Sequence, residues 1–281
     1  RNKKRNGPIF SLFEEFSFDI KKMELQFYNK KFWLKENNFY IVDHAQKKLE
    51  TFLKNNRTKT DIFDEDKWAR FFAITDLNYY EHARGVKSVK FFYNPVSGLF
   101  EPIGFDAHRM VPNYSPYISS WVDLTIKNSF ESALICKKNV TKCINSEPTK
   151  GGIGDYFIYK FFFNDEGELN DNFFKKYQKY IFKITSKDFL DKFFDDRKHS
   201  LKKINSLIYD DYFFVDHNYF YGPGLYYFSK EDIYLRAKNL SDYFSINLDK
   251  IFVKQSEDQI IIRNILNNNL SLKIKSMQCQ N

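Results

Sequence analysis

Residues 88–106 read SVKFFYNPVSGLFEPIGFD, and this stretch decides how the fold is interpreted. Its first run has apolar or aromatic side chains at every second position, at Val89, Phe91 and Tyr93. The second run is expected to present three side chains on one strand face, namely Leu99, Ile103 and Phe105. Between the runs, Pro95 suits the second position of a turn and Gly98 suits a left-handed backbone. The stretch therefore predicts a β-hairpin.

A helix is predicted immediately upstream, over residues 65–78. The side chains that share one stripe at helical spacing are Trp68, Phe71, Phe72 and Thr75. Asp64 suits the N-cap of this helix, and acidic residues follow it in the first turn. The helix ends near Asp76, and Asp106 comes directly after the second strand of the hairpin. The order is therefore helix, acidic loop, strand, tight turn, strand and acid.

Phosphotransferases of the protein-kinase type use this order of elements. One Asp in the loop accepts or orients the hydroxyl proton, and a second Asp holds Mg²⁺ on the nucleotide phosphates. Asp76 and Asp106 stand at these two places. Ordinary turn and capping carboxylates have the same spacing, so both interpretations stay open on the pattern alone.

Four more helices are expected from apolar periodicity, over residues 42–54, 171–184 and 187–208 and after Ser229. Ser186 suits the N-cap of the third, and Ser229 with Asp232 forms a pattern like a capping box. The polar segment 137–154 is expected to be a loop. Three short strands are expected near the end, over residues 250–254, 258–264 and 270–276. Because strands and helices do not alternate regularly, we expect an α+β, mainly helical unit.

Composition excludes several protein classes. With 10 Gly and 7 Pro among 281 residues, the chain is neither collagen-like nor of low complexity. Three Cys rule out a disulfide scaffold, and no apolar run is long enough to span a membrane. The net charge of +8 comes from 44 basic and 36 acidic residues that are interspersed, so no nucleic-acid partner is expected.

The quoted stretch, extended to residue 108, resembles the CotH kinase family, which is named for spore-coat proteins. Its members carry a similar FYxNPxTGxxEPIxxD segment. The residues IFDEDKWARFFAITDL at 62–77 resemble the family's preceding helix, and RNGPIF at 5–10 resembles a segment that follows its nucleotide lobe. The resemblance implies a protein-kinase-like C-lobe with a catalytic hairpin, in a fragment that lacks that lobe. It also implies two parts, a catalytic region at 1–247 and the start of a β-rich segment at 248–281.

The resemblance implies roles for individual residues. Asp76 would be the catalytic-loop Asp, His82 the loop His and Asp106 a metal ligand. Ser88 stands where the family's metal-binding Asn is expected, and Asn offers a better oxygen ligand. This departure implies either reduced activity or that Asn78 or a water takes the part of that Asn. The implied activity is transfer of the ATP γ-phosphoryl group to Ser or Thr of a coat or surface protein, with Mg²⁺ or Mn²⁺. The alternative is a non-catalytic, kinase-fold scaffold of a cell surface or coat, which the departure at Ser88 favours.

Other residues leave choices open. Arg84, Lys87 and Lys90 cluster near the proposed site, where they would either bind the nucleotide phosphates or form a solvated face. Cys136 and Cys143 are expected to be free thiols, unless export allows them to pair. A third function, binding of carbohydrate or a surface, rests on the aromatic residues and the C-terminal strands. The compartment stays open between the cell surface, export and the cytoplasm.

Overall fold

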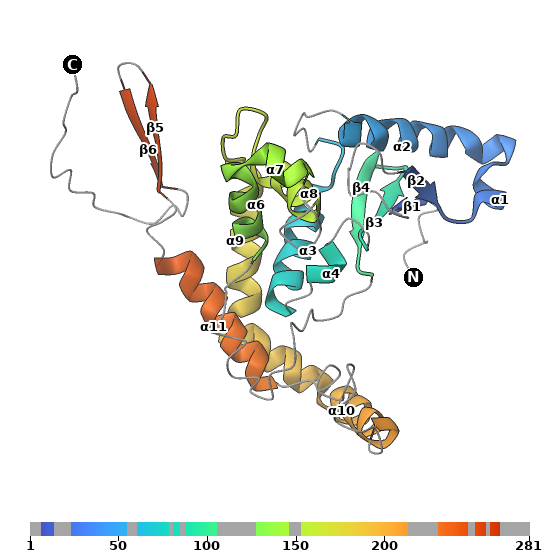
Figure 1. Ribbon diagram of the computed structural model, residues 1–281. Coiled ribbons are helices and arrows are strands. Elements are labelled where there is room, and N and C mark those ends of the chain that lie inside the picture. Colours follow the sequence, from blue (N-terminus) through green and yellow to red (C-terminus); the bar gives the residue numbers. More distant parts are fainter. Residues whose placement is uncertain are drawn as a thin grey trace.

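The computed structural model describes residues 7–13, 24–54, 61–78, 81–84, 88–105, 128–145, 153–212, 230–246, 251–256 and 259–264. This part of the chain is α+β and mainly helical, with a small antiparallel sheet (Figure 1). The strands are β1 (Ile9–Phe13), β2 (Glu24–Phe27), β3 (Lys90–Asn94), β4 (Leu99–Ile103), β5 (Ile251–Ser256) and β6 (Gln259–Asn264). The first helices are α1 (Lys30–Trp33), α2 (Glu36–Lys54), α3 (Glu65–Asn78) and α4 (Glu81–Arg84). The later helices are α6 (Ser129–Lys138), α7 (Val140–Asn145), α8 (Ile153–Phe162), α9 (Asp171–Thr185), α10 (Lys187–Tyr212) and α11 (Lys230–Ile246).

The hairpin prediction is confirmed, because β3 and β4 pair antiparallel and Gly98 adopts a left-handed φ of 70°. The expected apolar face of the second strand is wrong. Phe100 is the fully buried residue of β4, whereas Phe105 is 51% exposed. The pairing register gives the reason, since Phe100 lies opposite Tyr93 and therefore on the core face of the hairpin.

Two strands that the sequence did not indicate extend the hairpin into a sheet of order β2-β1-β3-β4. β1 follows Gly7, at which a Cβ would lie 1.9 Å from the carbonyl oxygen of Tyr93. Only glycine allows the two backbones to approach so closely. A hydrogen bond of 2.9 Å from the Tyr93 amide to the carbonyl oxygen of Pro8 holds them together.

Helix α3 begins and ends at the predicted residues and packs directly on the hairpin. The Asp64 side chain accepts a hydrogen bond from the Lys67 amide at 3.2 Å, which confirms the cap. The indole of Trp68 donates to the carbonyl of Phe100 at 3.0 Å, and Phe63 forms a bridge to the same residue. These contacts hold the start of α3 and the start of β4 together.

The core beside α3 is mostly aromatic. Rings from the α3 segment, β3 and α8 contact one another, among them Phe63, Trp68, Phe91, Phe157 and Phe161. The expectation of a loop over 137–154 is wrong in part, since the described residues there include α7 and the start of α8. The sequence did not indicate the start of α8, because the apolar residues of its first turns directly follow a polar stretch that is rich in turn-forming residues.

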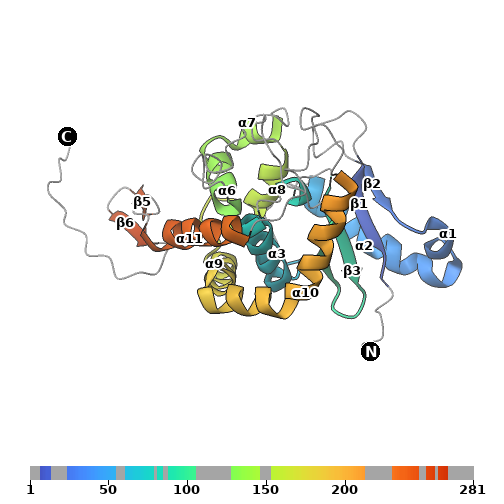
Figure 2. The ribbon, with the colours of Figure 1, turned by 90° about the horizontal axis from the view of Figure 1, so that it is seen from below.

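The remaining predicted helices are confirmed as α2, α9, α10 and α11, with α2 and α10 longer than expected. Ser186 caps α10 through the Phe189 amide, at 3.4 Å, whereas Ser229 lies outside the described residues. Figure 2 shows α10 crossing the molecule after α9. Two of the three C-terminal strands form the hairpin β5–β6, and residues 270–276 lie outside the described part. No helix among the described residues has the length and apolar character needed to cross a bilayer.

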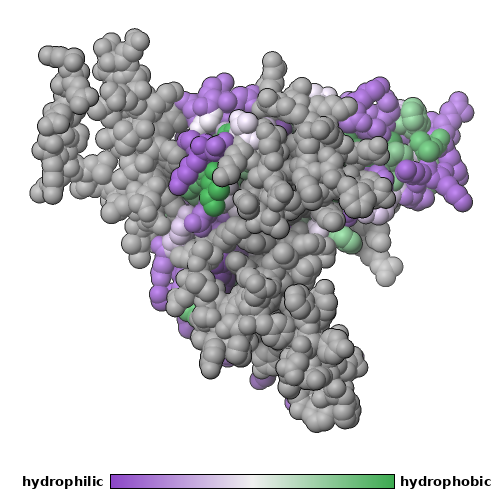
Figure 3. Space-filling view, in the orientation of Figure 1, coloured by the Kyte–Doolittle hydropathy of each residue, from purple (hydrophilic) through white to green (hydrophobic). Residues whose placement is uncertain are grey.

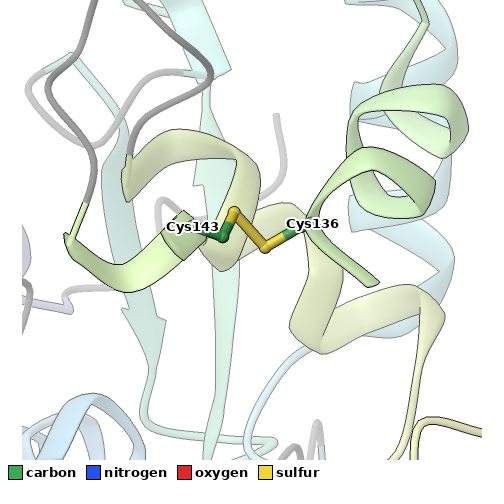
Figure 4. Close-up of a disulfide and its surroundings, with 2 residues drawn as sticks. All are labelled: Cys136 and Cys143. Atoms are coloured by element: carbon green, nitrogen blue, oxygen red, sulfur yellow. A yellow bond between two sulfur atoms is a disulfide. The ribbon is translucent and has the colours of Figure 1, made fainter. Parts of the chain in front are cut away.

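Cys136 and Cys143 form a disulfide in the structure, so the expectation of free thiols is wrong (Figure 4). The physical reason is local. α6 ends at Lys138 and α7 starts at Val140, and this abrupt change of direction brings the two cysteine Cα atoms to 5.3 Å. Both cysteines are buried.

Candidate functional site

A mostly buried lysine lies at the open end of the hairpin. Lys90 is the first residue of β3 and is only 8% exposed. Its Nζ lies 4.8 Å from the ring centroid of Phe105 and 6.0 Å from that of Tyr28. In the part of the chain that the structure describes, no carboxylate lies within ion-pair distance of it. Aromatic faces attract a cation, but they do not neutralise it as an anion would.

The residues predicted to bind metal or phosphate lie close in sequence to this end of the hairpin. Ser88 is 2% exposed and lies two residues before Lys90. Asp106 follows Phe105, whose ring contacts Lys90, but Asp106 itself lies outside the described residues, as does Lys87. Among the described residues, no group of three or more His, Cys, Asp or Glu side chains gathers as a metal site.

Asp76 occupies a different environment, in the last turn of α3. It is 1% exposed, and its carboxylate accepts hydrogen bonds from three side chains: Arg84, Ser129 and Tyr177. The Ser129 amide, at the start of α6, donates to both carboxylate oxygens at 3.0 Å. A carboxylate offers about four lone-pair sites, so these donors occupy the accepting capacity of Asp76.

These bonds connect elements that are far apart in the sequence. Arg84 comes from α4, Ser129 from α6 and Tyr177 from α9, while Nε of Arg236 in α11 donates to the Asp76 carbonyl at 3.0 Å. We call Asp76, Arg84, Ser129, Tyr177 and Arg236 the Asp76 cluster. All five are at most 7% exposed. A buried charge is tolerated when it is paired and hydrogen-bonded, and both conditions are met for Asp76.

The electrostatics keep Tyr177 in the donating form. Burial, and then the charge and hydrogen bond of Asp76, raise the pKa of Tyr177 well above its ordinary value of 10. The phenol therefore stays protonated over the physiological range and holds the Asp76 carboxylate. A substrate hydroxyl could reach that carboxylate only by displacing one of its present donors.

The structure thus separates residues that the sequence had grouped. Arg84 binds Asp76 and Lys90 is buried beneath rings, so neither belongs to a solvated face. Among the described residues, the side-chain contacts of Asp76 and Lys90 have no partner in common. His82 belongs to the short helix α4, and its side chain is outside the description.

Sequence reasoning missed Ser129, Tyr177 and Arg236. Tyr177 lies on the predicted 171–184 helix at the spacing of its apolar stripe, where it looks like an ordinary core residue. Comparisons with protein-family models, with curated proteins and with solved structures found no match to this chain.

Proposed function

We propose that this chain is the helical-lobe part of a CotH-like phosphotransferase, and that Lys90 binds a phosphate group at the open end of hairpin β3–β4. The observation that carries the proposal is the mostly buried side chain of Lys90, whose ammonium has two aromatic neighbours and no carboxylate partner in the described region. A charge whose surroundings are largely apolar is stabilised when an opposite charge meets it. A phosphate supplies that charge through short, charge-assisted hydrogen bonds.

The resemblance of residues 88–108 to the CotH segment supports ATP as the source of the phosphate. The oxygen donors of Asp106 and Ser88 are of the type that Mg²⁺ and Mn²⁺ accept, so they would hold the metal. The bound metal would neutralise charge on the phosphates. Lys90 would hold the transferred group in place, and Lys87 and His82 would complete the site. The acceptor would be Ser or Thr of a protein.

The proposal gives Asp76 a positioning role. Its carboxylate ties the end of α3 to α4, α6 and α9, and the hairpin strand β3 follows α4 within a few residues. Asp76 would thus hold in place the helices from which the hairpin extends. This departs from the general-base role that the resemblance implies, because all its acceptor positions are already used.

A second function has an observation in its favour. A non-catalytic kinase-fold scaffold would need no carboxylate free for a substrate hydroxyl, which agrees with the occupied carboxylate of Asp76 and with Ser at position 88. Metal-dependent ATP binding separates the two functions, because only the phosphotransferase requires it.

The experiment is a titration of the intact protein with ATP in the presence of Mg²⁺ or Mn²⁺, in which calorimetry measures the binding. Lys90→Met keeps an unbranched chain of similar length and removes the charge. We expect the Kd for ATP to rise at least tenfold, while the unfolding midpoint without nucleotide stays level or rises. Lys238→Met, on an exposed α11 lysine paired with Asp242, is the matched control. Equal affinity in the two variants would refute the role of Lys90, and no binding by the wild type would favour the scaffold.

A further inference from the structure

A groove lies at the turn end of the hairpin, away from Lys90. It has a volume of about 460 Å³ and lies between α2 and the turn that joins β3 to β4. This volume is within the range of small-molecule sites, roughly 300 to 1,000 Å³. Its walls are mostly apolar or aromatic, and the side chains that matter below are Tyr40, His44, Lys48, Tyr93 and Val96. Among the described residues, no acidic side chain lines it.

Two polar donors converge on the floor of this groove. A Cβ placed on Gly98 would lie 3.6 Å from Nζ of Lys48 and 3.8 Å from the hydroxyl oxygen of Tyr93. Lys48 donates to the carbonyl of Gly98 at 3.3 Å, a long bond to a neutral acceptor. Gly98 has a φ of 70° and no side chain, so the floor stays open between the donors.

The hydroxyl of Tyr93 is the more informative donor. Tyr93 is only 4% exposed as a residue, but its hydroxyl is not among the buried polar atoms that lack a partner, so in the described part of the chain it faces the groove. The ring of Tyr93 is held in the core, and its hydroxyl can donate to an acceptor on a ligand in place of water. Burial raises the pKa of Tyr93 above its ordinary value of 10, which keeps the group protonated and able to donate.

The walls define the rest of the ligand. Tyr40 is 67% exposed and Val96 80% exposed, so the groove is bordered by surface that water covers when the site is empty. The imidazole of His44 lies against the Tyr93 ring, with centroids 6.4 Å apart. In Figure 3, hydrophobic residues appear in green among hydrophilic ones at the end of the molecule that holds α1 and the start of α2, which precedes the part of α2 that lines the groove. A flat or aliphatic body would cover these side chains.

We infer that this groove binds a small organic anion, a carboxylate or phosphate ester carried on an aromatic or aliphatic body. The ammonium of Lys48 and the hydroxyl of Tyr93 receive the anionic oxygens, and Tyr40 and Val96 cover the body. The inference does not rest on the proposed phosphotransferase function, because the groove and Lys90 lie at opposite ends of β3.

The test is a nuclear magnetic resonance titration of the ¹⁵N-labelled protein with benzoate, phenyl phosphate and neutral benzamide. We expect at least one of the two anions to saturate shifts of residues around Gly98, and benzamide to leave them unchanged. Benzoate alone indicates a carboxylate ligand, and phenyl phosphate alone indicates a phosphate ester. Absence of saturation by both anions, or equal binding of benzamide, would overturn the inference.

Three variants locate the binding. Lys48→Gln should raise the Kd of the anion about tenfold. Tyr93→Phe should raise it several-fold without lowering the unfolding midpoint, because the hydroxyl faces the groove and makes no hydrogen bond to another described residue. Lys47→Gln is the matched control: Lys47 directly precedes Lys48 in α2, its side chain is 73% exposed and it pairs with Asp43 instead. If Lys48→Gln and Tyr93→Phe both bind the anion as Lys47→Gln does, the anion lies elsewhere and the inference fails.

Discussion

The phenol of Tyr177 donates a hydrogen bond to Oδ2 of Asp76 at 2.6 Å, across 101 positions of the sequence. This contact joins α9 to the end of α3 inside the core. It also explains why Asp76 has a structural role that its sequence neighbours did not reveal. The motif placed Asp76 beside the hairpin, but its partners come from four other elements, namely α4, α6, α9 and α11.

Tyr177→Phe removes only the hydroxyl from this contact. The buried carboxylate of Asp76 then loses one charge-assisted hydrogen bond, so the free energy of unfolding should fall by about 2 kcal/mol. Urea unfolding followed by circular dichroism measures the change. Tyr180→Phe, one turn along α9, is the control because its hydroxyl donates to the exposed Asp66 at 2.7 Å. Equal losses in the two variants would mean that burial of the Asp76 cluster adds nothing to the bond.

The disulfide between Cys136 and Cys143 closes a short segment, with a sequence separation of 7. Restriction of so short a loop in the unfolded chain stabilises the fold by about 2 to 3 kcal/mol. The double variant Cys136→Ala with Cys143→Ala should lose roughly this much. Urea unfolding with and without a reductant provides the measurement, and the reductant should affect the wild type alone. Unchanged unfolding of the wild type under full reduction would contradict a stabilising disulfide.

Acid stability should depend on Lys67, which pairs with Asp64 at 2.8 Å and with Glu101 of β4 at 2.7 Å. Burial opposes the charge of Asp64, but hydrogen bonds from the Lys67 side chain and amide outweigh it and lower the pKa of Asp64. The stability gained is therefore present above the ordinary value of 3.8 and is lost as pH falls through the lower folded value.

Lys67→Met should accordingly shift acid unfolding to higher pH. Tryptophan fluorescence along a pH series measures the midpoint, since Trp68 is buried next to this pair. Lys47→Met, at an exposed pair, should leave the midpoint where it is in the wild type. A midpoint that does not move in Lys67→Met would show that the pair does not set acid stability.

Local patterns predicted the hairpin and most helices, because the spacing of apolar residues and the choice of turn residues depend only on positions close together in the chain. Helix α3 was predicted with both ends, since Asp64 caps it. The sequence could not reveal strand β1, whose pairing with β3 joins residues about eighty positions apart. The buried face of β4 depended on the register between Tyr93 and Phe100, which no single strand encodes.

The candidate site was predictable to a lesser degree. Lys90 was singled out by its position near the motif, but its burial against Tyr28 and Phe105 depends on the sheet. Arg84 was predicted either to bind phosphate or to lie on a solvated face, and it instead pairs with Asp76 in the core. A basic residue beside a motif has the same appearance in sequence whether it binds a ligand or a buried carboxylate.

The most direct test of the proposed phosphotransferase is the rate at which the intact protein forms ADP from ATP. We expect formation of ADP with Mg²⁺ or Mn²⁺ that stops when the metal is chelated. Lys90→Met and Asp106→Ala should each lower the rate by two orders of magnitude or more, as expected for loss of a group that stabilises transferring phosphate. Lys238→Met should retain the wild-type rate. A wild-type rate that is the same with and without metal, or full activity in Asp106→Ala, would contradict the account.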